Sequence, residues 1–242
     1  MYTLGLEFST QSVKLVVLDL NSSACHYTGS FQYDTTFPEY ETHGGVLPSD
    51  IPEVRHTSPM MLVQAIDFAF RKLTDDGVDL RRVRAVKCDC MQHCTVFTSH
   101  QFADAVKQLS PRKNLVDQIR RCLSRKTVPI WEDRSPVEEV RYLTDFLAAC
   151  GGIHNLTGNR AELRFPAAQI LKWARQNTEE YRRTSGIFVL SAFITSVLAG
   201  RIAAVDTGDG WGTNLNHLDI KSPGWSRPVI SAADAYLRKM GL

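Results

Sequence analysis

Alternating apolar and polar positions open the chain and predict a small antiparallel meander. Residues 3–8, 13–20 and 24–33 each have the composition of a strand, and the polar turns 9–11 and 21–23 separate them. Short turns between such strands favour antiparallel neighbours. We therefore expect three strands to lie side by side before the first helix begins.

Longer periodicity predicts helices after this meander. A polar loop over residues 35–57 leads to a helix that begins at Ser58-Pro59, with proline in its first turn, and ends at Asp76-Gly77. Residues 83–89 then have the pattern of a strand buried on both faces, the return leg of a helical crossover. Further helices are expected at residues 114–123, 135–150, 167–176, 178–183, 191–198 and 231–240, short strands at 95–98, 128–131 and 187–189, and a loop at 206–212. Strands followed by alternating strands and helices are typical of an α/β domain, which binds ligands at strand ends.

Composition and charge exclude several classes of function. The 242 residues include 28 Lys and Arg against 26 Asp and Glu, a net charge of +2 that is too small to indicate nucleic acid or a membrane surface as partner. No apolar run is long enough to cross a bilayer, and a strand begins where a leader peptide would stand. We expect a cytoplasmic protein, with an organelle lumen as the open alternative.

Six cysteines, three of them within residues 88–94, invite a disulfide or metal interpretation. Their spacing is not that of a disulfide framework, so we expect them to be reduced. A structural zinc site normally needs a second Cys/His pair beyond a loop, and the sequence offers none. Cys88 and Cys90 would point to the same face of a strand, which favours small buried apolar side chains.

The turn of the first hairpin offers phosphate chemistry. Glu7 ends the first strand, Ser9, Thr10 and Gln11 supply hydroxyls and backbone amides, and Lys14 follows. Turn amides can form a nest for phosphate oxygens, and a carboxylate at a strand end can hold Mg²⁺, usually through water. An ordinary hairpin with a polar turn is the alternative, and the hairpin alone does not decide between the two.

Three later clusters supply groups that a polyol would need, namely paired hydrogen-bond donors and acceptors and an aromatic surface. They are Gln92 with His93, Trp131 with Asp133, and Arg164 with the Asp206/Asp209 loop. Each cluster has a structural alternative: a core histidine, a core tryptophan, an ion-paired arginine or a turn-forming aspartate. Together they predict one sugar-sized site.

The order of these motifs resembles that of the FGGY carbohydrate kinases, most closely the eukaryotic xylulokinases. Residues 5–14 are similar to the family's phosphate-binding hairpin, and eight more matches follow in order over nearly the whole chain. They lie at residues 38–40, 44–46, 57–59, 92–93, 129–133, 157–161, 164–165 and 209–215.

The resemblance implies the actin-like ATPase (ribonuclease H-like) fold, with residues 1–242 as its N-terminal, sugar-side domain. That domain has a mixed sheet with an antiparallel opening meander and helices on its faces. The resemblance also implies a kinase that uses ATP and Mg²⁺ to phosphorylate the 5-hydroxyl of D-xylulose, giving D-xylulose 5-phosphate. Its expected partners are the sugar, its own C-terminal kinase domain and, as an open alternative, a second copy in a homodimer. Another pentulose or polyol substrate, or a degenerate sugar-binding or regulatory protein, stays open as well.

Residue by residue, His93 and Arg164 match the family's substrate-binding histidine and arginine, and Gln92, Trp131 and Asp133 complete the expected substrate set. At the hairpin, Glu7 stands where the family has an aspartate near the magnesium, and Ser9, Thr10 and Gln11, with Lys14, form the turn below the phosphates.

Three departures accompany the resemblance. Glu7 is one methylene longer than the family's aspartate, and Cys88, Cys90 and Cys94 stand where the resembling kinases have glycines. The family's catalytic base is an aspartate in a Gly-Asp-Asn or Gly-Asp-Gln motif of a second domain, and no such motif precedes Leu242. We therefore expect no catalytic base within these residues and no turnover by them alone.

Overall fold

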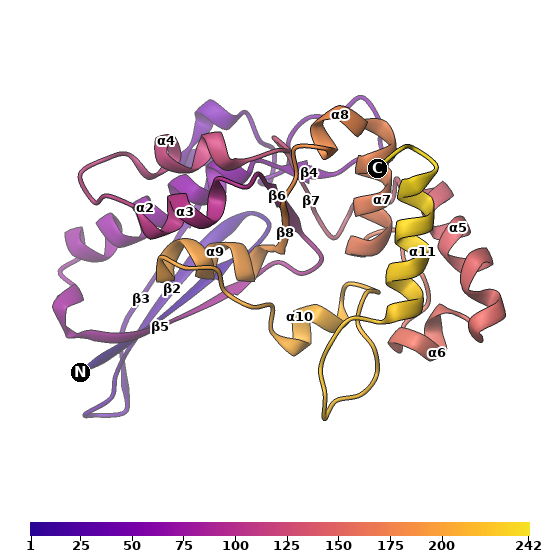
Figure 1. The fold of residues 1–242 in the computed structure, drawn as a ribbon. Helices are drawn as coiled ribbons and strands as arrows, with labels where there is room; N and C mark the ends of the chain where they lie inside the picture. The colour runs from indigo at the N-terminus through magenta and orange to yellow at the C-terminus, as the bar shows by residue number, and fades with distance from the viewer.

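The computed structural model describes all 242 residues, which form a strand-rich part beside a group of helices (Figure 1). The strands are β1 (Tyr2–Phe8), β2 (Ser12–Asp19), β3 (Ala24–Gln32), β4 (His56–Thr57), β5 (Val83–Cys90), β6 (Thr95–Thr98), β7 (Val128–Pro129) and β8 (Gly186–Val189). The helices are α1 (Tyr33–Thr36), α2 (Pro59–Asp75), α3 (Phe102–Lys107), α4 (Leu115–Ile119), α5 (Val137–Leu147), α6 (Ile153–Thr157), α7 (Pro166–Gln176), α8 (Thr178–Tyr181), α9 (Leu190–Ala199), α10 (Thr207–Trp211) and α11 (Arg227–Arg238). No helix combines the length and hydropathy that a bilayer crossing requires.

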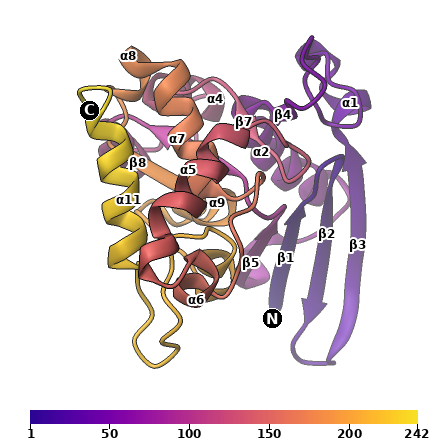
Figure 2. The same ribbon diagram turned by 90° about the vertical axis from the view of Figure 1, so that its right-hand side faces the viewer.

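The main sheet has four strands in the order β3-β2-β1-β5. β1 pairs antiparallel with β2, and β2 with β3, which confirms the predicted meander. β5 pairs parallel with β1 after the chain has crossed over through α2. The carboxyl ends of β1 and β5 therefore lie at the same edge of the sheet, where the loops that follow them can form a binding site. Figure 2 shows β1, β2 and β3 side by side at one border of the molecule.

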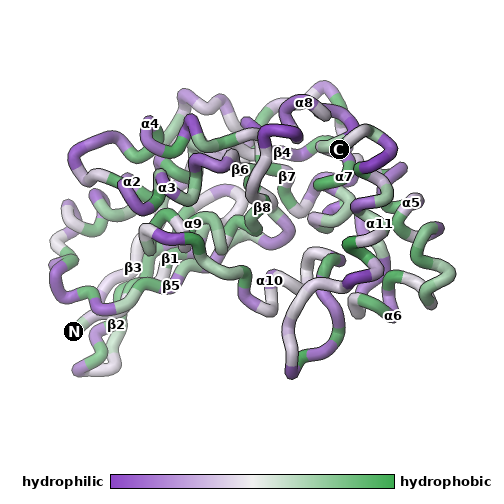
Figure 3. The backbone as a smooth tube through the Cα atoms, viewed as in Figure 1, coloured by the Kyte–Doolittle hydropathy of each residue, from purple (hydrophilic) through white to green (hydrophobic).

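One face of this sheet carries the core and the other is open. Leu4 and Leu6 of β1 are at most 2% exposed, whereas Val16 and Leu18 of β2, on the opposite face, are 37% and 43% exposed. The predicted mixed sheet is confirmed, but the helices of this chain cover only its inner face. In Figure 3 the helix α9, which packs against β5, is predominantly hydrophobic, as a core helix must be.

The prediction that residues 83–89 form a strand buried on both faces is wrong. β5 is an edge strand, and only Cys88 and Cys90 among its residues are buried. These two cysteines join the apolar core, so the interpretation of them as small buried apolar side chains is confirmed. The outward positions of β5 are exposed because no further strand or helix covers that edge.

Local signals placed the bounds of α2 well, whereas α3 and α6 were not predicted and α11 begins at Arg227, before the predicted start at residue 231. Ser58 caps α2 by accepting a hydrogen bond from the Met61 amide (3.3 Å), and α2 ends beside Gly77, which has a positive φ of 87°. The prediction of a loop at residues 206–212 is wrong, because this segment contains the short helix α10. Asp206 caps that helix by accepting from the Asp209 amide (3.0 Å).

The interior has two clusters. A large one of 33 buried residues joins the sheet to α2, α4 and α9, and a small one of eight buried residues lies among α5, α6, α7 and α11. The candidate site draws side chains from the sheet and from the segment that leads into α7, so it joins the two parts of the fold.

Candidate functional site

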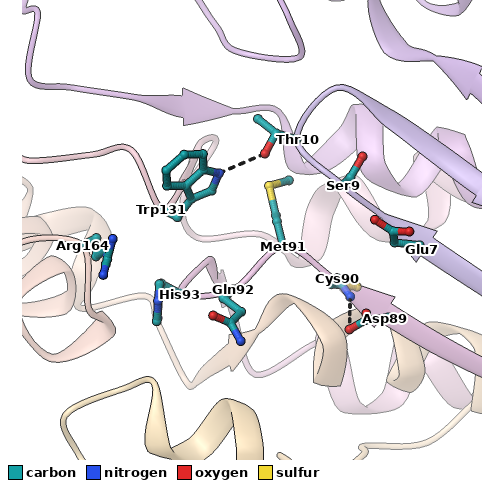
Figure 4. A pocket seen from close by; sticks show the side chains of 10 residues that line it. All are labelled: Glu7, Ser9, Thr10, Asp89, Cys90, Met91, Gln92, His93, Trp131 and Arg164. Carbon is teal, nitrogen blue, oxygen red and sulfur yellow. Dashed lines mark hydrogen bonds between the residues drawn. The ribbon is translucent and has the colours of Figure 1, made fainter. Parts of the chain in front are cut away.

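A cavity of about 350 Å³ lies at the ends of β1 and β5 (Figure 4). It gathers seven of the ten site residues predicted from sequence: Glu7, Ser9, Thr10, Gln92, His93, Trp131 and Arg164. Asp89, Cys90 and Met91 complete its lining. Figure 4 shows a polarity along this cavity, with His93 and Arg164 at one end and Glu7 and Ser9 at the other.

His93 is held in a fixed orientation. Its backbone has a φ of 65°, an uncommon conformation for a residue with a side chain, and its Nδ1 lies 2.8 Å from the carbonyl oxygen of Gly212. The ring packs against Phe165 at an interplanar angle of 35°, with centroids 4.5 Å apart. A Cβ on residue 212 would lie 3.0 Å from His93 Cε1, so the glycine permits this close approach.

The protonation state of His93 follows from these contacts. Burial lowers the pKa of His93, and the nearby Arg164 guanidinium lowers it further, against the opposing effect of the bond to Gly212. The ring is therefore neutral at pH 7. Because a carbonyl oxygen can only accept, Nδ1 carries the proton and donates it to Gly212, which leaves Nε2 as an acceptor.

Arg164 supplies the positive charge at this end of the cavity. It is exposed and makes no ion pair, so the predicted alternative of a structural ion pair does not describe it. It immediately precedes Phe165, the N-cap residue of α7, so the start of that helix fixes its position. Its guanidinium is free to donate several hydrogen bonds to a polar ligand.

Trp131 connects the two ends of the cavity. Its indole Nε1 donates to Thr10 Oγ1 over 3.1 Å, and the side chain is 44% exposed. It is therefore not the core tryptophan of the alternative interpretation. The Trp131 wall of the cavity is therefore bonded directly to the turn of the first hairpin.

Asp133 lies behind this wall, outside the cavity. It is fully buried and accepts hydrogen bonds from the amides of Arg55 and Ser135 (3.0 Å each) and from Gln169 Nε2 (2.8 Å). Burial raises the pKa of Asp133, but bonds from His56, Ser135 and Gln169 outweigh it and hold the pKa below its usual range. With its oxygens occupied, Asp133 is placed to support the segment that carries Trp131; the structure does not place it among the residues that face a sugar.

Two other predicted residues also lie outside the cavity. The backbone carbonyl of Gln11 accepts a hydrogen bond from the Tyr33 amide (3.0 Å), and the Gln11 side chain lies near Gly44. Lys14 stands directly opposite Glu7 across the β1–β2 pair, and its Nζ lies 3.1 Å from both Glu7 carboxylate oxygens. Lys14 therefore acts on the cavity only through Glu7.

Asp89 is a site residue that the sequence did not reveal. It is the parallel partner of Glu7 in β5, it lines the cavity, and its carboxylate accepts only the Cys90 amide (3.0 Å) without any ion pair. The available signal was strand alternation, because burial of Cys88 and Cys90 turns the residue between them to the other face. The Glu7 end of the cavity thus has one paired carboxylate and one unpaired carboxylate.

Comparison with known proteins identifies the family. No family model matches the chain. Rat xylulose kinase is 34% identical over 238 residues, which cover 98% of this chain and 44% of that enzyme. The chain belongs to the FGGY family of carbohydrate kinases. It spans less than half the length of the curated FGGY relatives it matches.

Solved structures support the FGGY fold. A xylulose kinase from Rhodospirillum rubrum superposes with a TM-score of 0.73 at 14% identity, covering 97% of this chain and 41% of that one. Plasmodium falciparum glycerol kinase, solved with ADP, gives a TM-score of 0.68 at 14% identity, covering 98% and 42%. Because kinases named for different polyols share this fold, the fold alone does not select the sugar.

The donor set at the Glu7 end of this FGGY domain fits Mg²⁺. The ion prefers oxygen ligands and is usually bound by one or two carboxylates together with waters and substrate phosphates. Glu7 and Asp89 supply the carboxylates, and Ser9 and Thr10 supply neighbouring hydroxyls. No group of three or more His, Cys, Asp or Glu side chains is arranged as a metal cage.

Asp209, from the predicted Asp206/Asp209 loop, lies near the cavity without lining it. Burial raises the pKa of Asp209, and the charges of Asp206 and Asp89 raise it too, while a hydrogen bond from Ser191 opposes them. Asp209 belongs to α10, the helix that ends next to Gly212, the acceptor of His93. It therefore acts on the site by fixing the segment that orients the histidine.

Proposed function

We propose that this chain forms the sugar-binding half of an ATP-dependent kinase that phosphorylates the 5-hydroxyl of D-xylulose, giving D-xylulose 5-phosphate. The observation that carries the proposal is the polarity of one cavity, which holds His93 and Arg164 at one end and Glu7, Ser9 and Thr10 at the other. Relatives named xylulose kinases over nearly the full length of the chain support the choice of sugar.

In this proposal the chain positions the sugar. Nε2 of His93 accepts a hydrogen bond from one sugar hydroxyl, Arg164 donates to another oxygen, and the Trp131 ring packs against the C–H face. At the other end the Thr10 hydroxyl donates to a phosphate oxygen, while the Ser9 hydroxyl donates to the Ser12 carbonyl and stabilises the turn. ATP supplies the phosphoryl group and Mg²⁺ balances its charge. Such kinases gain most of their rate from positioning and charge neutralisation, which is the task these side chains are suited to.

We also propose that a further domain supplies the nucleotide site and the general base. The matched relatives are more than twice as long as this chain, which leaves room for such a domain. Its base would take the proton from the 5-hydroxyl as the phosphoryl group arrives.

Calorimetry and a coupled ATPase assay with D-xylulose test this proposal. We expect the 242-residue chain to bind the sugar weakly without turnover, and a protein extended to the length of its relatives to turn it over. His93→Ala and Arg164→Ala should each abolish sugar binding, whereas Arg160→Ala, a change at an exposed arginine close in sequence, should not. Full turnover by the short chain would refute the need for a second domain, and absence of sugar binding by both proteins would refute the assignment.

A degenerate sugar-binding protein is the second candidate, because Lys14 engages both oxygens of Glu7. Titration of the extended protein with Mg-ATP separates the two candidates. Nucleotide binding together with turnover supports the kinase, whereas sugar binding without nucleotide binding supports the degenerate protein. A panel of pentuloses and polyols would then define the substrate.

We place the protein in a reducing compartment, the cytoplasm. All six cysteines are free, and Cys25 and Cys150 among them are exposed. Exposed free thiols are typical of proteins that are not subject to oxidative folding.

A further inference from the structure

A second cavity, here called the basic pocket, opens at the end of β6 between the segments 121–127 and 177–185. Its volume is about 800 Å³. Four cationic side chains line it, Arg121, Lys126, Arg182 and Arg183, against a single carboxylate from Glu180. This local excess of positive charge is greater than the net charge of +2 of the whole chain. In Figure 3 the chain at α8, beside this pocket, is strongly hydrophilic.

The cations of the basic pocket are largely unpaired. The side chains of Arg121, Lys126 and Arg183 make no ion pair, and Arg182 has only an exposed contact with Glu179 (3.4 Å). An exposed ion pair contributes little. The pocket is therefore lined by four positive charges against the single carboxylate of Glu180, and a bound anion would reduce the repulsion among them.

The wall of the basic pocket adds groups suited to a phosphate ester. Ser99, Thr127 and Ser185 bring hydroxyls, and Trp173 brings its aromatic ring, whose Nε1 is buried without a hydrogen-bond partner. Behind this tryptophan lies Arg125, only 4% exposed, with its Cζ 4.5 Å from the Trp173 ring centroid and its Nε and Nη1 unpartnered. A buried cation increases the positive potential at this wall because little solvent screens it.

We propose that the basic pocket binds a small phosphorylated metabolite, with its phosphate held by Arg121, Lys126 and Arg183 and its remainder against Trp173. Arginine pairs bidentately with phosphate oxygens, and an aromatic ring offers a flat surface to a sugar or a base. The cavity is large enough for such a molecule. This site is distinct from the proposed sugar pocket, with which it shares no lining residue.

Three short segments connect the basic pocket to the sugar pocket. Residues 93–99, which include β6, lead from His93 to Ser99. Residues 127–131, which include β7, lead from Thr127 to Trp131. Residues 164–173, which include the first part of α7, lead from Arg164 to Trp173. Each of these segments therefore has a residue of the sugar pocket at one end and a residue of the basic pocket at the other. An anion that orders the basic pocket acts on three walls of the sugar pocket, and we infer that the two ligands influence each other's affinity. This linkage rests on the proposed sugar-binding function, whereas anion binding does not.

Calorimetric titration of the 242-residue chain with inorganic pyrophosphate tests the anion site. We expect the double variant Arg121→Gln/Arg183→Gln to bind pyrophosphate at least tenfold more weakly than the wild type. The matched control, Arg84→Gln/Arg201→Gln, removes the same charge from exposed arginines outside the pocket and should bind as the wild type does. Circular dichroism should show that both variants are folded. Equal affinities in the three proteins, or equal losses in both variants, would overturn the proposal.

A second titration tests the linkage. The affinity for D-xylulose should change severalfold when pyrophosphate saturates the wild type, and should stay constant in the Arg121→Gln/Arg183→Gln variant. If pyrophosphate does not change the sugar affinity of the wild type, the linkage is refuted, but the proposed anion site is not. If no sugar binds under any condition, the proposed function fails, while the pyrophosphate titration still decides the anion site.

Discussion

Replacing Asp133 with asparagine separates a supporting role from a sugar-contacting one. Asp133 is fully buried and accepts four hydrogen bonds, from the amides of Arg55 and Ser135 (3.0 Å each), from Gln169 (2.8 Å) and from the Ser135 hydroxyl, and its Oδ2 lies 3.3 Å from His56 Nε2. Asparagine has the same shape but only one acceptor oxygen. Its NH₂ group would face the Arg55 amide if it replaced Oδ2, or the Ser135 amide and Gln169 if it replaced Oδ1. Either orientation places donors against donors in a dry site.

The magnitude follows from these contacts. A buried donor without a partner costs about 1–3 kcal/mol, and the remaining bonds change from charge-assisted to neutral at about 1 kcal/mol each. Burying a neutral amide instead of a carboxylate offsets part of this loss. We expect Asp133→Asn to lower the free energy of unfolding by about 2–4 kcal/mol, which is a shift of roughly 1 M in the urea midpoint for a slope of about 2–3 kcal/mol/M.

Urea unfolding followed by circular dichroism measures this shift, and calorimetry with D-xylulose measures the sugar affinity of the folded variant. Asp145→Asn makes the same chemical change at an exposed position and should move the midpoint by less than about 0.2 M, because surface changes are within about 0.5 kcal/mol. Trp131→Ala, at a 44% exposed side chain, should lose sugar affinity with little loss of stability. If Asp133→Asn unfolded at the wild-type midpoint but no longer bound sugar, Asp133 would contact the ligand and our placement of it would be wrong.

Three further predictions concern the cavity itself. Because burial lowers the pKa of His93 below its ordinary 6.5, sugar affinity should be constant above that pH and should fall in more acidic solution as Nε2 is protonated. If the same pH dependence of sugar affinity persisted in His93→Gln, the titration would belong to another group. Asp89→Asn should weaken Mn²⁺ binding, followed by electron paramagnetic resonance, whereas Lys14→Gln should strengthen it up to about fivefold by releasing Glu7 from an exposed ion pair. An unchanged Mn²⁺ affinity in Asp89→Asn would make Glu7 the only metal-facing carboxylate. Thr10→Val removes the acceptor of the Trp131 indole, and a lost hydrogen bond of about 0.5–1.5 kcal/mol should reduce sugar affinity roughly two- to tenfold, whereas Thr10→Ser should retain it.

His93 also contributes to stability through the same pKa shift. Its folded-state pKa is lower than that of the unfolded chain, so the unfolded chain binds more protons in mildly acidic solution. The contribution is complete above pH about 6.5 and is lost as the pH falls through the lower, folded-state pKa. The pH dependence of sugar binding should therefore be measured where the protein remains folded.

The first hairpin and α2 were predictable because their signals are local. Strand alternation fixes which side chains of residues 3–8 are buried, and Ser58-Pro59 at one end with Gly77 at the other bounds the helix. The environment of β5 is not a local property. The position of β5 at an edge depends on the order of strands in the sheet, so the apolar sequence of β5 could not predict that most of the strand is exposed.

Site residues divide in the same way. Motif order brought together residues from four distant segments, but it could not distinguish Trp131, which faces the cavity, from Asp133, which faces inward two positions later. Asp89 was overlooked because it stands between two cysteines assigned to the core. The basic pocket had no motif at all, since Arg121, Lys126 and Arg183 meet only after folding.

The single bond between Thr10 and Trp131 constrains how this site could be redesigned. In the proposed kinase, reshaping the tryptophan wall to admit a bulkier polyol would also loosen the turn of the first hairpin, so a gain in substrate range would come with a slower reaction. Arg164, whose side chain has no comparable bond to the hairpin, is the better starting position for altered selectivity.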